Sequence, residues 1–201
     1  MFSFLIFLTS QLNEFISEGK FTMPDNKLKI NSFLPQFNLT GTDGKIYSSE
    51  DFADKNILVV VFSCNHCPYV QAYEGRMIDL QNEFKDKGVQ IVAINSNDDY
   101  KYPEDSFDEM KKRADEKHFN FPYLRDETQE IAKAFGASHT PQIFLFNTER
   151  RLKYEGKIDD NWQEPDKVQN HYLRDAISEV LYEKEVSVPE TFSIGCTIKW
   201  K

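Results

Sequence analysis

The chain has 201 residues, of which 40% are hydrophobic and 14% aromatic, so it can bury the core of one domain. Its 33 acidic and 24 basic residues give a net charge of -9, which predicts a soluble protein that does not bind nucleic acid. Three cysteines are too few for the disulfide framework of a small secreted domain, so we expect any role they have to be chemical.

The N-terminal segment lacks most features of an export signal. Residues 2–8 form a mostly apolar stretch, yet the first basic residue is Lys20 and no small-residue cleavage pattern follows. The apolar stretch is also far shorter than the roughly 20 residues that cross a bilayer. We interpret residues 1–26 as a leader or N-terminal extension and predict a cytoplasmic protein with no membrane span. The alternative is export, if residues 1–22 act as a signal.

The first predicted elements after this segment are a hairpin, a strand and a helix. Residues 37–52 (FNLTGTDGKIYSSEDF) contain two strand-like runs around a Gly-containing turn, which predicts a β-hairpin. Residues 56–62 (NILVVVF) are a continuous apolar run, typical of a strand covered on both faces in a largely parallel sheet. Residues 69–87 have apolar side chains spaced by three or four, so they predict a helix that Gly88 ends. A second buried strand is predicted at 89–95.

The second half of the chain alternates short strands and helices. Residues 103–118 begin with proline and acidic residues and end with lysine and histidine, the charge order that a helix dipole favours. The other predicted elements are a strand at 121–126, a helix at 127–136, strands at 140–147 and 151–156, and a helix at 166–182. This alternation, with a strand pair late in the chain, predicts an α/β three-layer sandwich around a mixed central sheet.

The predicted strand at 56–62 runs into FSCNHCPYV, where Cys64 and Cys67 stand just before the predicted helix at 69–87. Free N–H groups at a helix N-terminus stabilise a thiolate, and a Cys-x-x-Cys arrangement lowers a cysteine's pKa. We predict that Cys64 is the attacking nucleophile and that Cys67, about one turn on, resolves the mixed disulfide. Pro68 suits a first helical turn, and we expect His66 to add positive charge that makes the disulfide more oxidising.

Other uses of this cysteine pair stay open. A structural zinc site needs two further ligands, and His118, His139 and His171 each stand alone. A soft-metal-binding module would use Cys64, Cys67 and His139 for an ion such as Cu(I). A redox-silent binding module would keep the fold with unreactive thiols. The sequence indicates no organic cofactor, because it has neither Gly-x-Gly-x-x-Gly after a strand nor Gly-x-x-x-x-Gly-Lys.

Thr140 and Pro141 precede the strand QIFLFN. An X-Pro bond adopts the cis form at modest cost, and a proline that begins a strand leaves a backbone edge free to pair with an extended peptide. Together with the Cys-x-x-Cys helix, this dipeptide makes residues 33–183 resemble the thioredoxin-like superfamily. The resemblance implies a thiol–disulfide oxidoreductase that acts on a protein or a small disulfide and is supplied with electrons by a reductase or a thiol pool. It also implies that Thr140 and Pro141 orient the partner's backbone.

The opening FLPQFNLTGTDGKIYSSEDFADKNILVVVF and the ending SIGCTIKW are similar to the peroxiredoxin-like (AhpC/TSA, redoxin) branch, within a bacterial group that carries Cys-x-x-Cys. This resemblance implies thiol-dependent peroxidase activity as the alternative, antioxidant function. The peroxidase motif Pro-x-x-x-Thr/Ser-x-x-Cys is not matched, because Val60 stands seven positions before Cys67 and Ile57 seven before Cys64. The buried acidic residue that thioredoxins have before the first cysteine also has no counterpart around Leu58, so another group must transfer protons.

The remaining cysteine lies in the C-terminal tail. Residues 186–201 have too few apolar side chains for a domain of their own, so we expect them to dock on a domain at 27–185. If the tail docks near Cys64, Cys196 is a third redox thiol; otherwise it is a buried small hydrophobe. His139, just before the Thr-Pro dipeptide, either stands near the disulfide or is a solvated loop histidine.

Overall fold

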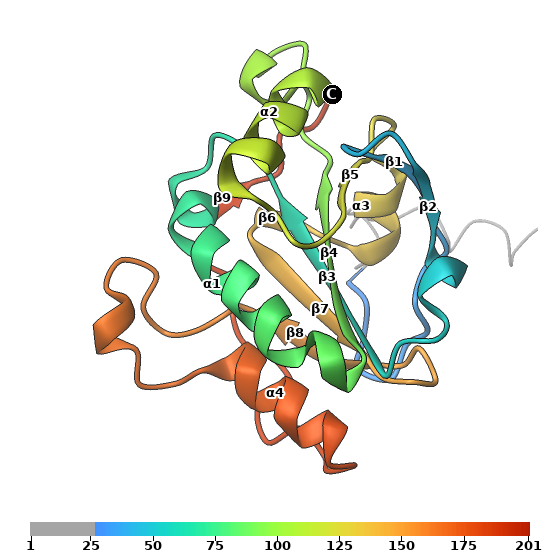
Figure 1. The fold of residues 1–201 in the computed structure, drawn as a ribbon, viewed down its shortest axis with the longest axis vertical. Coiled ribbons are helices and arrows are strands. Elements are labelled where there is room, and N and C mark those ends of the chain that lie inside the picture. Colours follow the sequence, from blue (N-terminus) through green and yellow to red (C-terminus); the bar gives the residue numbers. More distant parts are fainter. Residues whose placement is uncertain (1–26) are drawn as a thin grey trace, which may run out of the picture.

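The computed structural model describes residues 27–201, which build helices on both faces of a seven-stranded sheet (Figure 1). In spatial order the strands are β2 (Ile46–Ser48), β1 (Asn38–Gly41), β5 (Tyr123–Arg125), β4 (Val89–Asn95), β3 (Ile57–Ser63), β7 (Gln142–Phe146) and β8 (Leu152–Gly156). A separate two-stranded sheet pairs β6 (His139–Thr140) with β9 (Cys196–Thr197). The predicted leader at 1–26 lies outside the described residues.

The helices form the two outer layers. They are α1 (Pro68–Phe84), α2 (Phe107–Lys117), α3 (Glu130–Phe135) and α4 (Tyr172–Leu181). Residues of α1, α2 and α4 share one hydrophobic cluster on one face of the sheet, and α3 shares the other with the segment before β1. The predicted three-layer sandwich and its N-terminal hairpin, formed by β1 and β2, are confirmed. Between residues 27 and 201, no helix has the length and apolar character needed to cross a membrane.

Strand β3 lies inside the sheet, parallel to β4 and antiparallel to β7. All seven of its residues are buried, which explains why its sequence is a continuous apolar run. Ile57, Val59 and Val61 face the cluster under α1, and the alternate residues Leu58 and Val60 face the cluster under α3. Each such side chain contributes about 1.5–3 kcal/mol on burial, so β3 holds the two layers together.

Three predicted helices begin later than their sequence pattern suggested. The helix expected from residue 103 is a 3-10 turn at Pro103–Asp105, and α2 starts only after Ser106, whose backbone is extended. The helix expected from residue 127 begins after Gln129, which has a positive φ of 64°. The helix expected from residue 166 begins as a 3-10 turn at Pro165–Lys167 and a loop, and α4 starts only at Tyr172. In the first of these helices the break has a chemical consequence, because it turns the Asp105 side chain into the interior.

The tail crosses back over the domain after α4. The N–H of Glu155 donates to the carbonyl of Pro189 at 2.9 Å, and the N–H of Thr191 donates to the carbonyl of Glu155 at 2.9 Å, so the tail first follows β8. Farther on, β9 pairs with β6 beside the start of α1 (Figure 1). The tail therefore ends next to the Cys-x-x-Cys segment.

Candidate dithiol active site

The two cysteines stand where β3 passes into α1. Cys64 directly follows the last residue of β3, and Cys67 is the N-cap of α1, with Pro68 in the first turn. A proline is suited to this position because the first N–H groups of a helix have no intrahelical partner. Cys64 is 1% exposed and Cys67 is fully buried. The strand-to-helix placement predicted for the pair is what the structure has.

Thr140 contacts both thiols. The Cys64 Sγ lies 3.3 Å from Thr140 Oγ1, and the protonated Cys67 donates to the Thr140 carbonyl at 3.2 Å. The Thr140–Pro141 bond is cis. The structure thus brings together four of the residues that the sequence analysis selected, although Cys67 and Thr140 are 73 positions apart.

The two thiols have opposite preferences for charge. A hydrogen bond to Cys67, burial and the negative charge of Asp105 all raise the pKa of Cys64. The pKa of Cys67 is lowered by hydrogen bonds, first from the Cys64 thiol and then from the Cys196 thiol and the N–H of Val70. The attack by Cys64 stays a prediction, and these contacts favour negative charge on Cys67 in the reduced pair. Cys67 is the N-cap residue of α1, at the end of the helix where the first N–H groups have no intrahelical partner.

His66 does not present an unpaired positive charge to the thiols. Its Nδ1 lies 2.6 Å from Asp105 Oδ2, and its ring stacks on Tyr102 with the planes 8° apart. Asp105 is fully buried and also accepts from the Asn65 N–H at 2.6 Å and from Asn97 Nδ2 at 2.7 Å. Any charge on His66 is therefore balanced by a carboxylate, so the expected shift toward a more oxidising disulfide stays a prediction.

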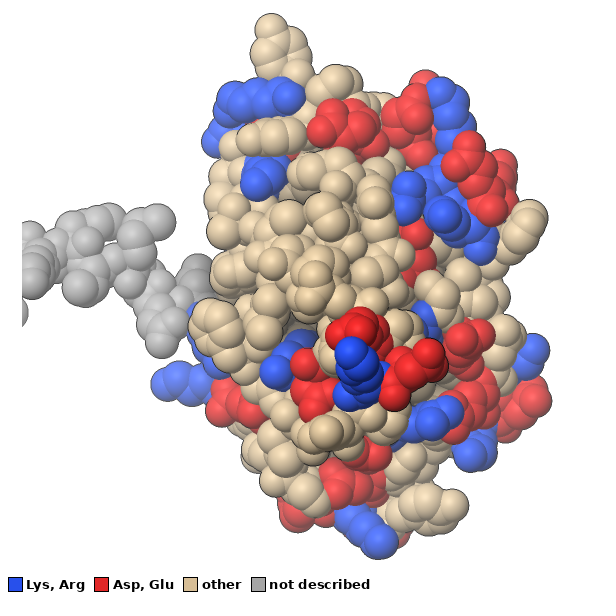
Figure 2. Space-filling model, turned by 90° about the vertical axis from the view of Figure 1, so that its left-hand side faces the viewer, with Lys and Arg blue, Asp and Glu red and all other residues tan. Residues whose placement is uncertain are grey.

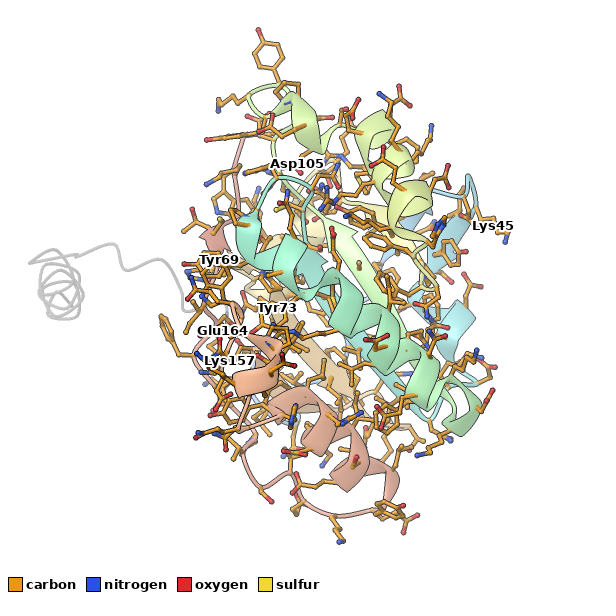
Figure 3. The ribbon with its side chains drawn as sticks, turned by 60° about the vertical axis from the view of Figure 1, so that its left-hand side comes forward. Lys45, Tyr69, Tyr73, Asp105, Lys157 and Glu164 are labelled. Atoms are coloured by element: carbon orange, nitrogen blue, oxygen red, sulfur yellow. The ribbon has the colours of Figure 1, made fainter. Side chains whose placement is uncertain are left out.

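Asp105 is the site residue that sequence reasoning missed. Its carboxylate lies near the start of α1 (Figure 3), and one ligand atom each of Cys64, His66 and Asp105 lie within 4.8 Å of one another. Within PEDSF it looks like an ordinary acidic residue in a helical first turn, and no local signal marks it as buried. Asp105 is a buried acidic residue close to Cys64, whereas the segment before Cys64 contains none.

The grouping of Cys64, His66 and Asp105 also has the residue types of a metal site. The soft-metal alternative named Cys64, Cys67 and His139 as ligands, whereas the histidine in this grouping is His66. The His139 Nδ1 lies 2.8 Å from the Ser138 hydroxyl, and its ring lies 6.3 Å from that of Phe192.

Cys196 lies beside the pair, on strand β9. It is the antiparallel partner of Thr140, is half-buried, and packs against the cluster formed by Cys64, Cys67 and Val70. Burial and a hydrogen bond to Cys67 raise the pKa of Cys196 to about 11. Pairing with β9 also occupies the backbone edge at Thr140, which was predicted to be free for a partner peptide.

The fold and the cysteine pair beside a cis-proline define a thioredoxin-like protein, and its class is the thiol-dependent oxidoreductases. The chain belongs to the AhpC/TSA family, whose model matches residues 30–155.

Solved structures and curated proteins agree with this assignment. An uncharacterized conserved protein from Geobacillus kaustophilus is 40% identical and superposes with a TM-score of 0.83, over 88% of this chain and 94% of that one. The thiol-disulfide oxidoreductase ResA of Bacillus thuringiensis is 26% identical over 155 residues, which are 76% of this chain and 83% of ResA. Peroxiredoxin Bcp of Escherichia coli is 25% identical over 111 residues, which are 55% of this chain and 66% of Bcp.

Proposed function

We propose that this protein exchanges a disulfide with a partner protein or a small disulfide, with Cys64 and Cys67 as the working dithiol. One observation carries the proposal: Cys64 and Cys67 pack together at the N-terminus of α1, and Thr140 contacts both. A dithiol in this arrangement can form a disulfide without leaving its helix, and a helix N-terminus stabilises the thiolate that exchange requires.

The contacts suggest the roles of the residues. The Cys67 thiolate attacks a partner disulfide, which forms a mixed disulfide and releases the partner's first thiol. Cys64 then loses its proton and attacks the Cys67 sulfur, which releases the second partner thiol and leaves a Cys64–Cys67 disulfide. Asp105, which contacts His66, has its carboxylate within 4.8 Å of the Cys64 sulfur and is the group that we propose receives the Cys64 proton, directly or through one water. If Cys64 attacks first, as its sequence position predicts, the same steps run with the roles of the two cysteines exchanged.

A redox titration tests the proposal. The protein is equilibrated in glutathione or dithiothreitol buffers of set potential, alkylated and weighed, with Cys67→Ser as the matched control. We expect one two-electron transition between about -120 and -270 mV, the span of thioredoxin-like oxidoreductases, and none in the control. A wild-type protein whose Cys64 and Cys67 stay alkylatable at every potential would contradict the proposal.

A thiol-dependent peroxidase is the second candidate, and the stabilised Cys67 thiolate together with the AhpC/TSA match favours it. A hydroperoxide would oxidise Cys67 to a sulfenic acid, which Cys64 would convert to the same disulfide with loss of water. Hydroperoxide consumption in the presence of dithiothreitol is the test. Turnover that disappears in Cys67→Ser supports this candidate, and a rate equal to that of dithiothreitol alone rejects it.

The partner and the compartment are also proposals. The face with β9 and the start of α1 has a broad area without charged side chains, bordered by Lys, Arg, Asp and Glu (Figure 2). Such a surface suits a disulfide-bearing protein partner that has few charged side chains near its cysteines. We further propose that the protein works in the bacterial cytoplasm, where a reductase or thiol pool keeps protein thiols reduced.

A further inference from the structure

The C-terminal tail adds a third thiol to the buried pair. Strand β9 places Cys196 opposite Thr140, the residue that contacts both Cys64 and Cys67. Cys196 packs against the cluster formed by Cys64, Cys67 and Val70. Cys67 is therefore the shared neighbour of two thiols, and either of them can form a disulfide with it.

The three thiols differ in their access to solvent. Cys64 and Cys67 are buried under the tail, whereas Cys196 is half-buried. Disulfide exchange requires the attacking sulfur to reach the sulfur that it attacks. A partner too large to enter the core therefore meets Cys196 before it meets the pair.

Packing on both sides holds Cys196 in this position. Gly195 lies so close to Thr140 that an added Cβ would stand 2.1 Å from the Thr140 carbonyl oxygen. Ile198 is 3% exposed, and its N–H donates to the Ser138 carbonyl at 2.9 Å. The sulfur of Cys196 is thus preorganised against Cys67 by its neighbours on the chain.

The chain beyond Ile198 is fastened as well. The Lys199 N–H donates to Asn97 Oδ1 at 2.8 Å, and the Lys199 carbonyl accepts from the Asp98 N–H at 2.8 Å. Gln129, a buried residue of the loop before α3, donates to the same carbonyl at 2.9 Å. A partner therefore gains access to the buried pair only by breaking several contacts, unless Cys196 transfers the disulfide for it.

We propose that Cys196 is a third redox-active thiol, which forms a disulfide with Cys67 and relays oxidising equivalents between the buried pair and the partner. This inference rests on the proposed function of Cys64 and Cys67 and adds the step that connects them to the surface.

The relay balances in atoms and electrons. Cys196 attacks the Cys67 sulfur of the Cys64–Cys67 disulfide, which forms a Cys67–Cys196 bond and releases Cys64, and the proton of Cys196 passes to Cys64. One thiolate of a partner dithiol then attacks the half-exposed Cys196 sulfur and expels Cys67 as a thiolate, the leaving group that the start of α1 stabilises. The partner's second thiol attacks its own mixed disulfide and frees Cys196. Two electrons have passed from the partner dithiol to the protein, and the reverse sequence reduces a partner disulfide.

A trapping experiment tests whether the second disulfide forms. Cys64→Ser in the full chain is treated with oxidised glutathione, its free thiols are alkylated, and it is digested without reductant for mass spectrometry. We expect a linked peptide pair that contains Cys67 and Cys196, and its loss in the double variant Cys64→Ser/Cys196→Ala. Glutathione on Cys67 together with a fully alkylated Cys196 would overturn the relay.

Rates separate the relay from the proposed function. With oxidised glutathione as the probe, Cys196→Ala should still form the Cys64–Cys67 disulfide, but several-fold more slowly than the wild type. Thr197→Ala, its exposed neighbour on β9, is the matched control and should keep the wild-type rate. An unchanged rate in Cys196→Ala overturns the relay and leaves the proposed function intact. If the wild-type pair forms no disulfide at all, the proposed function itself fails.

Gly195→Ala tests the same geometry while keeping every cysteine. The added methyl group has no room against the Thr140 carbonyl, so it should move Cys196 away from Cys67. In the Cys64→Ser background we expect a several-fold smaller yield of the linked peptide, with the far-ultraviolet circular dichroism of the parent. An undiminished yield would show that Cys196 does not depend on this packing and would contradict the preorganised relay.

Discussion

The central strands and the small sheet of β6 and β9 differ in what they contribute. Strands β3 and β4 pair over seven residues each, and β3 is buried along its whole length. Strands β6 and β9 pair over only two residues each, but Thr140 and Cys196 in that pair contact the thiols. Stability therefore depends mainly on the large sheet, whereas the chemistry depends on a short contact between segments far apart in the chain.

The largest expected effect is on stability, in the large sheet. Phe144 of β7 is fully buried and packs edge-to-face against Phe62 and Phe135. Phe144→Ala should lower the free energy of unfolding by about 3–5 kcal/mol, because it removes apolar contacts and leaves a cavity. Urea unfolding measures this change. Phe192→Ala, on an 80% exposed side chain of the tail, is the control and should stay within about 0.5 kcal/mol of the wild type.

If Phe144→Ala and Phe192→Ala were equally destabilising, stability would not be concentrated in the large sheet. Phe144→Ala should also keep its Cys64–Cys67 transition at temperatures where it is folded, since the ring does not belong to the thiol cluster.

A smaller effect is expected beside the thiols. Asp105→Asn removes the negative charge near Cys64 and turns an amide toward groups that donate to Asp105, namely the Asn65 N–H and Asn97 Nδ2. We expect a loss of about 1–3 kcal/mol of stability from a mismatched buried hydrogen bond. Because the charge of Asp105 raises the pKa of Cys64, its removal should lower that pKa.

Alkylation of Cys64 as a function of pH, in a Cys67→Ser background, measures this shift. The same background with Asp105 intact is the reference. If the Cys64 profile does not move to lower pH in the Asn variant, the carboxylate does not act on the thiol.

The third prediction concerns pH and Cys67. The pKa of Cys67 in the folded reduced protein lies below the ordinary 9.0. Its contribution to the stability of the folded state is therefore fully present above pH 9.0. Its contribution falls as the pH drops toward the folded pKa, because the thiolate that the fold stabilises is then protonated. Cys196→Ala removes one hydrogen bond to this thiolate and should raise the pKa of Cys67 by about one unit, since a unit corresponds to about 1.4 kcal/mol.

Thiolate ultraviolet absorbance during a pH titration of the reduced protein follows this ionisation, with Cys67→Ser as the blank. A titration of Cys67 that is identical with and without Cys196 would show that β9 does not influence the thiolate.

The smallest effect is expected at an exposed ion pair between two of the helices that cover the large sheet. Arg174 of α4 pairs with Glu83 of α1, and the two side chains are 49% and 37% exposed. Arg174→Ala should cost about 1 kcal/mol or less, because water and salt screen an exposed ion pair. Urea unfolding should give a smaller difference from the wild type at high salt than at low salt. A loss comparable to that of Phe144→Ala would place the main stability outside the core.

The tail shows most clearly what local patterns cannot predict. The run NILVVVF predicted β3 because burial on both faces leaves a continuous apolar signature, and the cysteine spacing with Pro68 predicted the start of α1. Asp105 and Gly195 have no such signature. An acidic residue after a proline and a glycine in a polar tail become significant only through contacts with segments many positions away.

The sequence by itself therefore determined the alternation of strands and helices, the fold class, the cysteine pair and the Thr140-Pro141 loop. These features depend on residue periodicity and on short motifs, which are local along the chain. Tertiary structure alone decided that Thr140 contacts both Cys64 and Cys67, that a buried carboxylate lies near Cys64, and that Cys196 completes a cluster of three thiols. The reason is physical: charge stabilisation and thiol contact depend on distances between side chains, and folding sets these distances between residues that are remote in sequence.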